Sequence, residues 1–320
     1  MAMEVRTCRN AIAAALLVAL AGCDGDDDGT RTPSSGAPVS TPADAFADLD
    51  RLIADADAYR FVADILREDA GFSREGEPFD GSFITDVFAG FERATDGNGD
   101  TATLLAEKRT ALQELTAVGC EINGEYDGVG FADTPDGEDS DGEFGEFVSA
   151  GEALPLSDET RALGVLLPDT ADDETGPFYE WDMPDELDRT TIGVLSVEVP
   201  GDVFPGLGTL TVPATPLAGL VVDAPQTVES VVRWEPLGDG GTITIGMDVD
   251  GDGDDFVGIS CVTDDDGEFR VPDATLARLP GAVDGPADYF VERQRTGIAP
   301  LGEAIVLSTG RTIRILSANE

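Results

Sequence analysis

The sequence contains no histidine at all, and Lys108 is its only lysine. Histidine is the usual general base at neutral pH and the commonest metal ligand. Its absence excludes Ser-His and Cys-His nucleophile pairs and zinc sites built on histidine. A Ser-Lys pair would have to use Lys108, which lies in a predicted helix of alternating charge and is expected at the surface. No Asp-Thr-Gly or Asp-Ser-Gly triplet occurs, so aspartic proteases are excluded too. We therefore expect no catalytic activity.

Positive charge is scarce throughout. Lys and Arg together number 19 against 65 Asp and Glu, which gives a net charge of −46. Without a basic patch to displace phosphate counterions, nucleic-acid binding is excluded. The acidic residues are spread along the chain, so the surface is expected to be a hydrated carboxylate layer that repels itself at low ionic strength. High salt or divalent cations should relieve that repulsion.

The apolar run near the N-terminus is short. Arg6 and Arg9 precede "AIAAALLVALAG", which is too short for a comfortable membrane span and is typical of a secretory signal over residues 1–22. The motif Leu20, Ala21, Gly22 and Cys23 resembles the lipobox of bacterial lipoproteins. That resemblance implies a lipid-modified Cys23 as the first mature residue and a body held at a membrane of the cell envelope. The alternative is a plain signal peptide with an incidental cysteine.

Four further segments follow the signal. Residues 23–41 are rich in Gly, Ser, Thr, Pro and Asp, which predicts a flexible tether. Residues 42–120 carry helical apolar stripes, and residues 121–149 form an acidic Gly-Asp stretch that we interpret as a linker. Residues 150–320 are β-rich. The predicted fold class is α+β, with a short helical bundle followed by an immunoglobulin-like antiparallel β-sandwich.

Three apolar stripes predict the bundle. Pro42 and Asp44 mark a helix start, from which a helix is expected over roughly residues 42–68. The stripe residues in the three predicted helices are Phe46, Leu49, Ile53, Ala56, Tyr59, Val62 and Leu66, then Ile84, Val87, Phe88 and Phe91, then Leu104, Leu105, Ala111, Leu112, Leu115 and Val118.

The stretch "DGNGDTATLLAE", residues 96–107, lies between the second and third predicted helices. Asp96, Asn98, Asp100 and Glu107 take the positions at which an EF-hand loop supplies calcium ligands, with the Ala102 carbonyl at position seven. Thr101 replaces the usual glycine and Thr103 the usual apolar residue, so the resemblance to an EF-hand is degenerate. The alternative is a solvated connector in which Asp100 caps the third helix and Glu107 faces water.

Short apolar runs separated by Pro and Gly fill the C-terminal half and predict strands. The runs cover residues 191–201, 209–214, 217–225, 230–236, 241–249, 256–264, 267–272, 288–297 and 303–316, with a short helix at 273–280. Val232 and Trp234 are expected in the core, and Val257, Ile259 and Cys261 should point inward. The order "VPGDVFPG…VVRWEP…ISCVTDDDGEFRVPDATLARLP" resembles a sandwich domain of uncharacterised secreted or lipid-anchored proteobacterial proteins. The resemblance implies a fold and an envelope setting but no activity.

A second acidic cluster, "DVDGDGDD", occupies residues 248–255 at an expected hairpin tip. Asp248, Asp250 and Asp252 with Gly253 have the spacing of calcium loops, and Asp254 or Asp255 would complete the ligand shell. The alternative is a hydrated acidic turn. A third cluster, Asp264, Asp265 and Asp266, follows the next strand and is a candidate for the same end of the sandwich.

Two cysteines remain after Cys8 leaves with the signal and Cys23 carries lipid. In an oxidising compartment Cys120 and Cys261 can pair, which would pin the helical segment to the sandwich. Alternatively, Cys261 is a buried free thiol.

These features together favour a lipid-anchored envelope protein of structural or binding type, with calcium in its acidic loops. Its partners would be the membrane and an envelope protein or a glycan. One alternative is an envelope hydrolase that acts through carboxylates. Another is an acidic, salt-adapted structural lipoprotein that binds no specific metal.

Overall fold

The described residues in the computed structural model are 42–74, 83–94, 100–124, 146–169, 177–184, 187, 192–250, 256–279 and 285–318. All of them belong to one compact unit, Ser34–Glu320. The predicted signal peptide and the whole of the predicted tether, including Cys23, lie outside the described residues. Lipid anchoring therefore stays a prediction.

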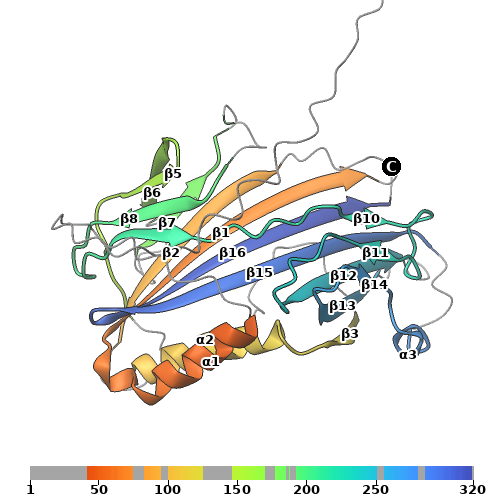
Figure 1. Cartoon of the computed structure of the whole chain (residues 1–320), viewed down its shortest axis with the longest axis horizontal. Coiled ribbons are helices and arrows are strands. Elements are labelled where there is room, and N and C mark those ends of the chain that lie inside the picture. The colour runs from red at the N-terminus through yellow and green to blue at the C-terminus, as the bar shows by residue number, and fades with distance from the viewer. Residues whose placement is uncertain are drawn as a thin grey trace, which may run out of the picture. The chain divides into compact units, whose positions relative to one another are not determined.

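Most of the described chain is β-strand (Figure 1). One sheet runs, in spatial order, through β3 (Gly119–Gly124), β13 (Phe256–Asp264), β12 (Thr242–Asp250), β15 (Ala287–Leu301), β16 (Ala304–Ser317), β1 (Phe61–Arg74), β2 (Ile84–Arg93), β7 (Phe178–Asp182), β6 (Ala162–Asp169), β5 (Leu154–Asp158), β8 (Leu195–Val199) and β9 (Gly208–Val212). β4 (Glu146–Phe147) pairs with β2. A second sheet holds β10 (Val221–Val222), β11 (Val232–Arg233) and β14 (Glu268–Phe269).

The helical elements are few. They are α1 (Pro42–Ala54), the 3-10 turn η1 (Ala56–Ala58), α2 (Thr101–Glu114) and α3 (Asp273–Leu276). Figure 1 shows α1 and α2 side by side below the end of β15 and β16 where those two strands join. The predicted start of α1 at Pro42, with Asp44 in its first turn, is confirmed.

The prediction of a mainly antiparallel β structure in the C-terminal half is confirmed. Each of the nine predicted runs overlaps one strand from β8 to β16, and α3 lies at the predicted short helix. The strand order differs from that of an immunoglobulin domain, in which seven to nine strands divide between two sheets. Here most described strands follow one hydrogen-bonded path, in which only β1 and β16 pair in parallel.

The predicted helical bundle is wrong in two of its three helices. α1 ends at Ala54, and the rest of that stripe enters β1, while the second stripe is β2. Both strands carry apolar residues on both faces, so these residues occur without the strict alternation of a half-buried strand. β1 and β2 pair with each other, β1 pairs with β16, and β3 pairs with β13. Strands from before the predicted linker at 121–149 therefore share one sheet with strands that follow it.

The long strands have two differently covered faces. We call the face of β1, β15 and β16 that carries Val62, Ile298 and Leu307 the helix-side face, because these residues pack with α1 and α2. The opposite, core face of β1 and β2 carries Ala63, Ile65, Val87 and Phe91, which pack with residues of β5, β8 and β9.

A third core lies on the core face of β12, β13 and β15, against β11 and the neighbouring loops. It contains Val232 and Trp234, as predicted, and Ile259 and Cys261 point into it. The predicted burial of Val257 is also confirmed, because 6% of that residue is exposed. Apolar burial of this kind supplies most of the folding free energy of such a chain.

Candidate binding groove and the predicted metal sites

A groove of about 310 Å³ opens on the helix-side face beside α2. Its lining residues come from β1, β2, β4, β7, β15, β16 and α2, and they are Asp64, Leu66, Phe88, Gly90, Glu92, Lys108, Phe147, Phe178, Gln294, Thr309 and Arg311. A second hollow of about 300 Å³ shares five of these residues, namely Asp64, Lys108, Gln294, Thr309 and Arg311. Sequence motifs did not reveal this groove.

Gly90 on β2 lines the groove and allows two Phe rings to pack close to the strand. A Cβ built on Gly90 would lie 3.2 Å from Cε1 of Phe147 and 3.7 Å from the Phe178 ring, so both rings stand over the glycine. The Phe178 ring also stacks on Phe88, with ring centroids 6.0 Å apart. A glycine inside a strand often marks a place where another group approaches the backbone closely. The groove therefore has an aromatic wall that packs down onto the β2 backbone at Gly90.

Charged side chains form the other wall. Nζ of Lys108 lies 2.9 Å from Oδ2 of Asp64 and 4.0 Å from Oε1 of Glu92. Lys108 reaches the surface as expected, but its side chain is only 31% exposed and lines the groove. The Asp64 carboxylate raises the pKa of Lys108. The amine is thus held as ammonium, whereas a nucleophilic lysine needs a lowered pKa.

Glu92 is the most deeply buried charge in this wall, with 8% of its side chain exposed. Burial raises the pKa of its carboxyl group, although Lys108 acts in the opposite direction. Within the described residues no hydrogen bond to the Glu92 carboxylate is found, and the one ion pair of this carboxylate is the 4.0 Å contact with Lys108. A buried carboxylate with such incomplete pairing is unfavourable.

A row of polar residues crosses the sheet next to the groove. Gln294, Arg311, Glu68, Asp86 and Asp182 are successive cross-strand partners on β15, β16, β1, β2 and β7. Arg311 donates hydrogen bonds to Glu68 at 3.2 Å and to Glu292 at 2.8 Å. Burial raises the pKa of Glu68 and of Asp86, and the carboxylate of Asp182 raises the latter further. Acids that face each other directly across strands repel, so this face favours cations.

The EF-hand prediction for residues 96–107 lacks its helix-loop-helix context, because the strand β2 precedes the loop. Asp100 is the N-cap of α2, and its carboxylate accepts a 2.8 Å hydrogen bond from the Thr103 backbone N–H, which lowers the pKa of Asp100. Glu107 is exposed on α2. Asp96 and Asn98 lie outside the described residues. The connector alternative thus fits the described part of this segment.

The second predicted calcium cluster adjoins the hairpin of β12 and β13. Asp248 faces Asp288 directly across β12 and β15, and burial together with that neighbour raises the pKa of Asp248. Asp250 is the last residue of β12, whereas Asp252, Asp254 and Asp255 lie outside the described residues. Within the described ranges, no group of three or more potential metal ligands is close enough together to hold an ion.

The third acidic cluster has a different role, because Asp265 is fully buried. Its carboxylate accepts hydrogen bonds from Trp234 at 2.7 Å, from Arg293 at 2.8 Å and from Arg295 at 3.0 Å. With these donors in place, Asp265 joins the loop after β13 to β15 and is not free to bind a metal.

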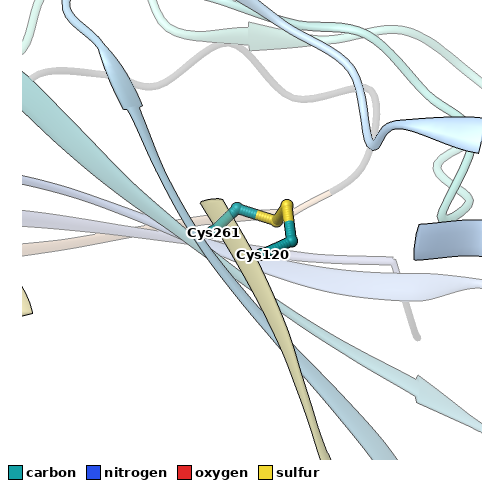
Figure 2. The surroundings of a disulfide bond; sticks show 2 residues. All are labelled: Cys120 and Cys261. Carbon is teal, nitrogen blue, oxygen red and sulfur yellow. A yellow bond between two sulfur atoms is a disulfide. The ribbon is translucent and has the colours of Figure 1, made fainter. Parts of the chain in front are cut away.

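Cys120 and Cys261 form a disulfide with an S–S distance of 2.10 Å. Cys261 is therefore not a free thiol. Figure 2 shows the bond between the neighbouring strands β3 and β13, where the two cysteines are direct cross-strand partners. Their separation of 141 residues ties the segment after α2 to the C-terminal half.

None of the described helices is long and apolar enough to cross a membrane. No known family model matches the sequence, and no curated protein is significantly similar to it.

Proposed function

We propose that this protein is a non-enzymatic binding protein of the cell envelope, anchored by lipid on Cys23, which holds a small ligand in the groove beside α2. The lipobox-like motif at residues 20–23 and the Gly-Pro-rich stretch after it support the anchor and its tether. The lack of histidine and the charged state of Lys108 support a binding role over a catalytic one.

One observation carries the proposal. The groove combines a wall of three Phe rings, two of which pack onto Gly90, with a buried and incompletely paired Glu92. Ligand sites are concave and mostly apolar, with a few convergent polar groups. Because the Glu92 carboxylate makes only one long ion pair among the described residues, its oxygens are available to bind a ligand.

A thermal-shift screen tests the binding role. Neutral sugars, carboxylates and organic cations would be added separately to the full chain carrying Cys23→Ser. Saturable stabilisation by one class, lost in Gly90→Val, supports a ligand in the groove. If no class stabilises the chain, or if Gly90→Val leaves the stabilisation unchanged, the groove is not the site.

Calcium at the β12–β13 hairpin is the second part of the proposal. The face-to-face pair of Asp248 and Asp288 supports it, because two opposed carboxylates gain stability when a cation lies between them. Calorimetric titration of calcium in high sodium chloride tests this site, with Asp248→Asn/Asp288→Asn as the variant. Saturable heat that disappears in the variant is the expected result. The matched control is Asp96→Asn/Glu107→Gln, which should leave that heat unchanged; loss only in this control would place calcium in the 96–107 loop instead.

Carboxylate-dependent hydrolysis is a second candidate function, since Glu92 is a groove carboxyl whose pKa is raised by burial, as a general acid requires. Hydrolysis of 4-nitrophenyl glycosides and esters would test it. A turnover that falls about 100-fold or more in Glu92→Gln would establish the hydrolase in place of the binding protein. Equal background rates in both chains would exclude it.

A further inference from the structure

We propose that the groove binds a substituted ammonium ion, with its cationic head between the Glu92 carboxylate and the rings of Phe147 and Phe178. This inference rests on the proposed function, in which the groove is a ligand site, and it names the class of ligand.

The first argument is the state of Glu92. Its side chain is 8% exposed and lines the groove, and the only cation paired with it in the described part of the chain lies at the 4.0 Å limit of an ion pair. Taking a carboxylate out of water is costly unless a cation or hydrogen-bond donors replace the lost hydration. A ligand ammonium would supply the missing charge and, in primary to tertiary amines, an N–H donor.

The second argument is the aromatic wall. Phe147 on β4 is the direct cross-strand partner of Glu92 on β2, so the ring and the carboxylate lie side by side. The Phe178 ring stands over Gly90, two residues before Glu92 on the same face of the strand. Ring faces attract ammonium ions within about 6 Å, and such attraction adds to a carboxylate on the other side. An aromatic and acidic pair of walls therefore fits an organic cation.

The third argument is the local charge. Four carboxylates, Asp64, Glu68, Glu92 and Glu292, surround two cations, Lys108 and Arg311. Lys108 is paired closely with Asp64, and Arg311 is held by Glu68 and Glu292. The remaining charge at the groove is negative. An anionic ligand would be repelled, and a neutral sugar would leave Glu92 without a counter-charge.

The experiment is a calorimetric titration of choline chloride into the full chain carrying Cys23→Ser, in sodium chloride near physiological strength. Choline serves as the probe for the class, and 3,3-dimethylbutan-1-ol is its uncharged isostere. We expect saturable choline binding, at least tenfold weaker binding of the isostere, and at least tenfold weaker choline binding in Glu92→Gln. Gly90→Val should abolish binding, because the added side chain pushes the Phe147 and Phe178 rings out of their positions. Unfolding temperatures of both variants confirm that they fold.

Two further variants test whether choline binds in the groove or is only attracted by the overall negative charge of the chain. Glu198→Gln removes one charge from an exposed position on β8 and should bind choline like the parent chain. Lys108→Met removes the cation that competes for Glu92, so it should tighten choline binding. Weakening in Lys108→Met, or equal weakening in Glu198→Gln and Glu92→Gln, would overturn the inference.

The experiments distinguish a wrong ligand class from a groove that binds no ligand. If sugars or carboxylates stabilise the chain, choline does not, and Gly90→Val removes that stabilisation, the groove is a ligand site but not for ammonium. If no class of compound stabilises the chain, both are wrong.

Discussion

Two buried carboxylates in the same sheet have opposite surroundings. Asp265 lies against the core face of β15, where Arg293, Arg295 and Trp234 all donate hydrogen bonds to it. Glu92 lies on the helix-side face, where it accepts no hydrogen bond within the described residues and reaches one ammonium group at 4.0 Å. Both side chains are largely removed from water, but only one has its bonding capacity filled.

The difference indicates what each carboxylate does. A buried charge with all its partners fixes the position of the strands and loops that supply them. A buried charge with unfilled capacity contributes little to the fold, and it is the kind of exception that calls for an explanation outside the fold. In this chain the explanation we offer is a ligand cation.

The largest effect is expected when the complete network is broken. Asp265→Asn removes the negative charge between Arg293 and Arg295, whose side chains are 1% and 2% exposed. Arg293 loses its carboxylate and Arg295 keeps only Asp239, so the free energy of unfolding should fall by about 3–5 kcal/mol. Urea unfolding measures this loss. Asp264→Asn, at the exposed neighbouring position, is the matched control and should change stability by about 0.5 kcal/mol or less.

Removal of the disulfide tests whether the free energy of unfolding can change without a change in ligand affinity at the groove. Cys120→Ser/Cys261→Ser should lower the free energy of unfolding by about 2–4 kcal/mol, because the cross-link restricts a long loop of the unfolded chain. Choline affinity should not change, since neither cysteine lines the groove. If stability and choline affinity fell together, the disulfide region and the groove would be coupled, which would contradict the separate roles assigned to them.

A smaller effect is expected at the start of α2, the helix that carries Lys108. Asp100→Ala removes the hydrogen bond to the Thr103 N–H and should cost about 1 kcal/mol of stability in urea unfolding. Glu107→Ala, at an exposed position of the same helix, is the control and should cost less. If Glu107→Ala is the more damaging change in the presence of calcium, the EF-hand interpretation returns.

The smallest effect concerns pH. The pKa of Glu92 is raised above its ordinary value of 4.5, so the folded chain binds this proton more tightly than the unfolded chain does. The resulting stabilisation is present below pH 4.5 and is lost as the pH rises through the raised pKa. Glu68 and Asp86 act in the same direction.

Urea unfolding across this pH range measures the slope. Stability should fall with rising pH, and Glu92→Gln should make that fall shallower. Glu198→Gln, which removes a charge from an exposed position, is the control. An unchanged slope in Glu92→Gln would mean that Glu92 does not titrate as its burial implies.

The sequence predicted those elements whose local pattern agrees with their surroundings. The strands from β8 to β16 were recognised because short β-branched runs end at Pro and Gly. β1 and β2 were mistaken for helices because apolar residues occur on both of their faces, and the spacing of Ile84, Val87, Phe88 and Phe91 fits a helix equally well.

The groove could not be predicted from the sequence, because its lining residues are far apart in the chain and meet only through the pairing register of the strands. Glu92 and Phe147 are 55 positions apart and meet only through the pairing of β2 with β4, and Lys108 arrives on a separate helix. A lone glycine inside an apolar stretch, Gly90, was the one local signal. Cys120 and Cys261 were identifiable as candidates, but a choice between bond and thiol needed the register of β3 with β13.

The most direct test of the central claim is the free energy of unfolding of Glu92→Gln beside that of the parent chain, at neutral pH and without ligand. The account predicts a free energy of unfolding equal to or above that of the parent chain. Gln removes a buried charge whose one ion pair among the described residues is the 4.0 Å contact with Lys108, and Lys108 keeps its ion pair with Asp64. A loss of about 2 kcal/mol or more would contradict it, since a loss of that size is expected of a carboxylate whose bonds serve the fold.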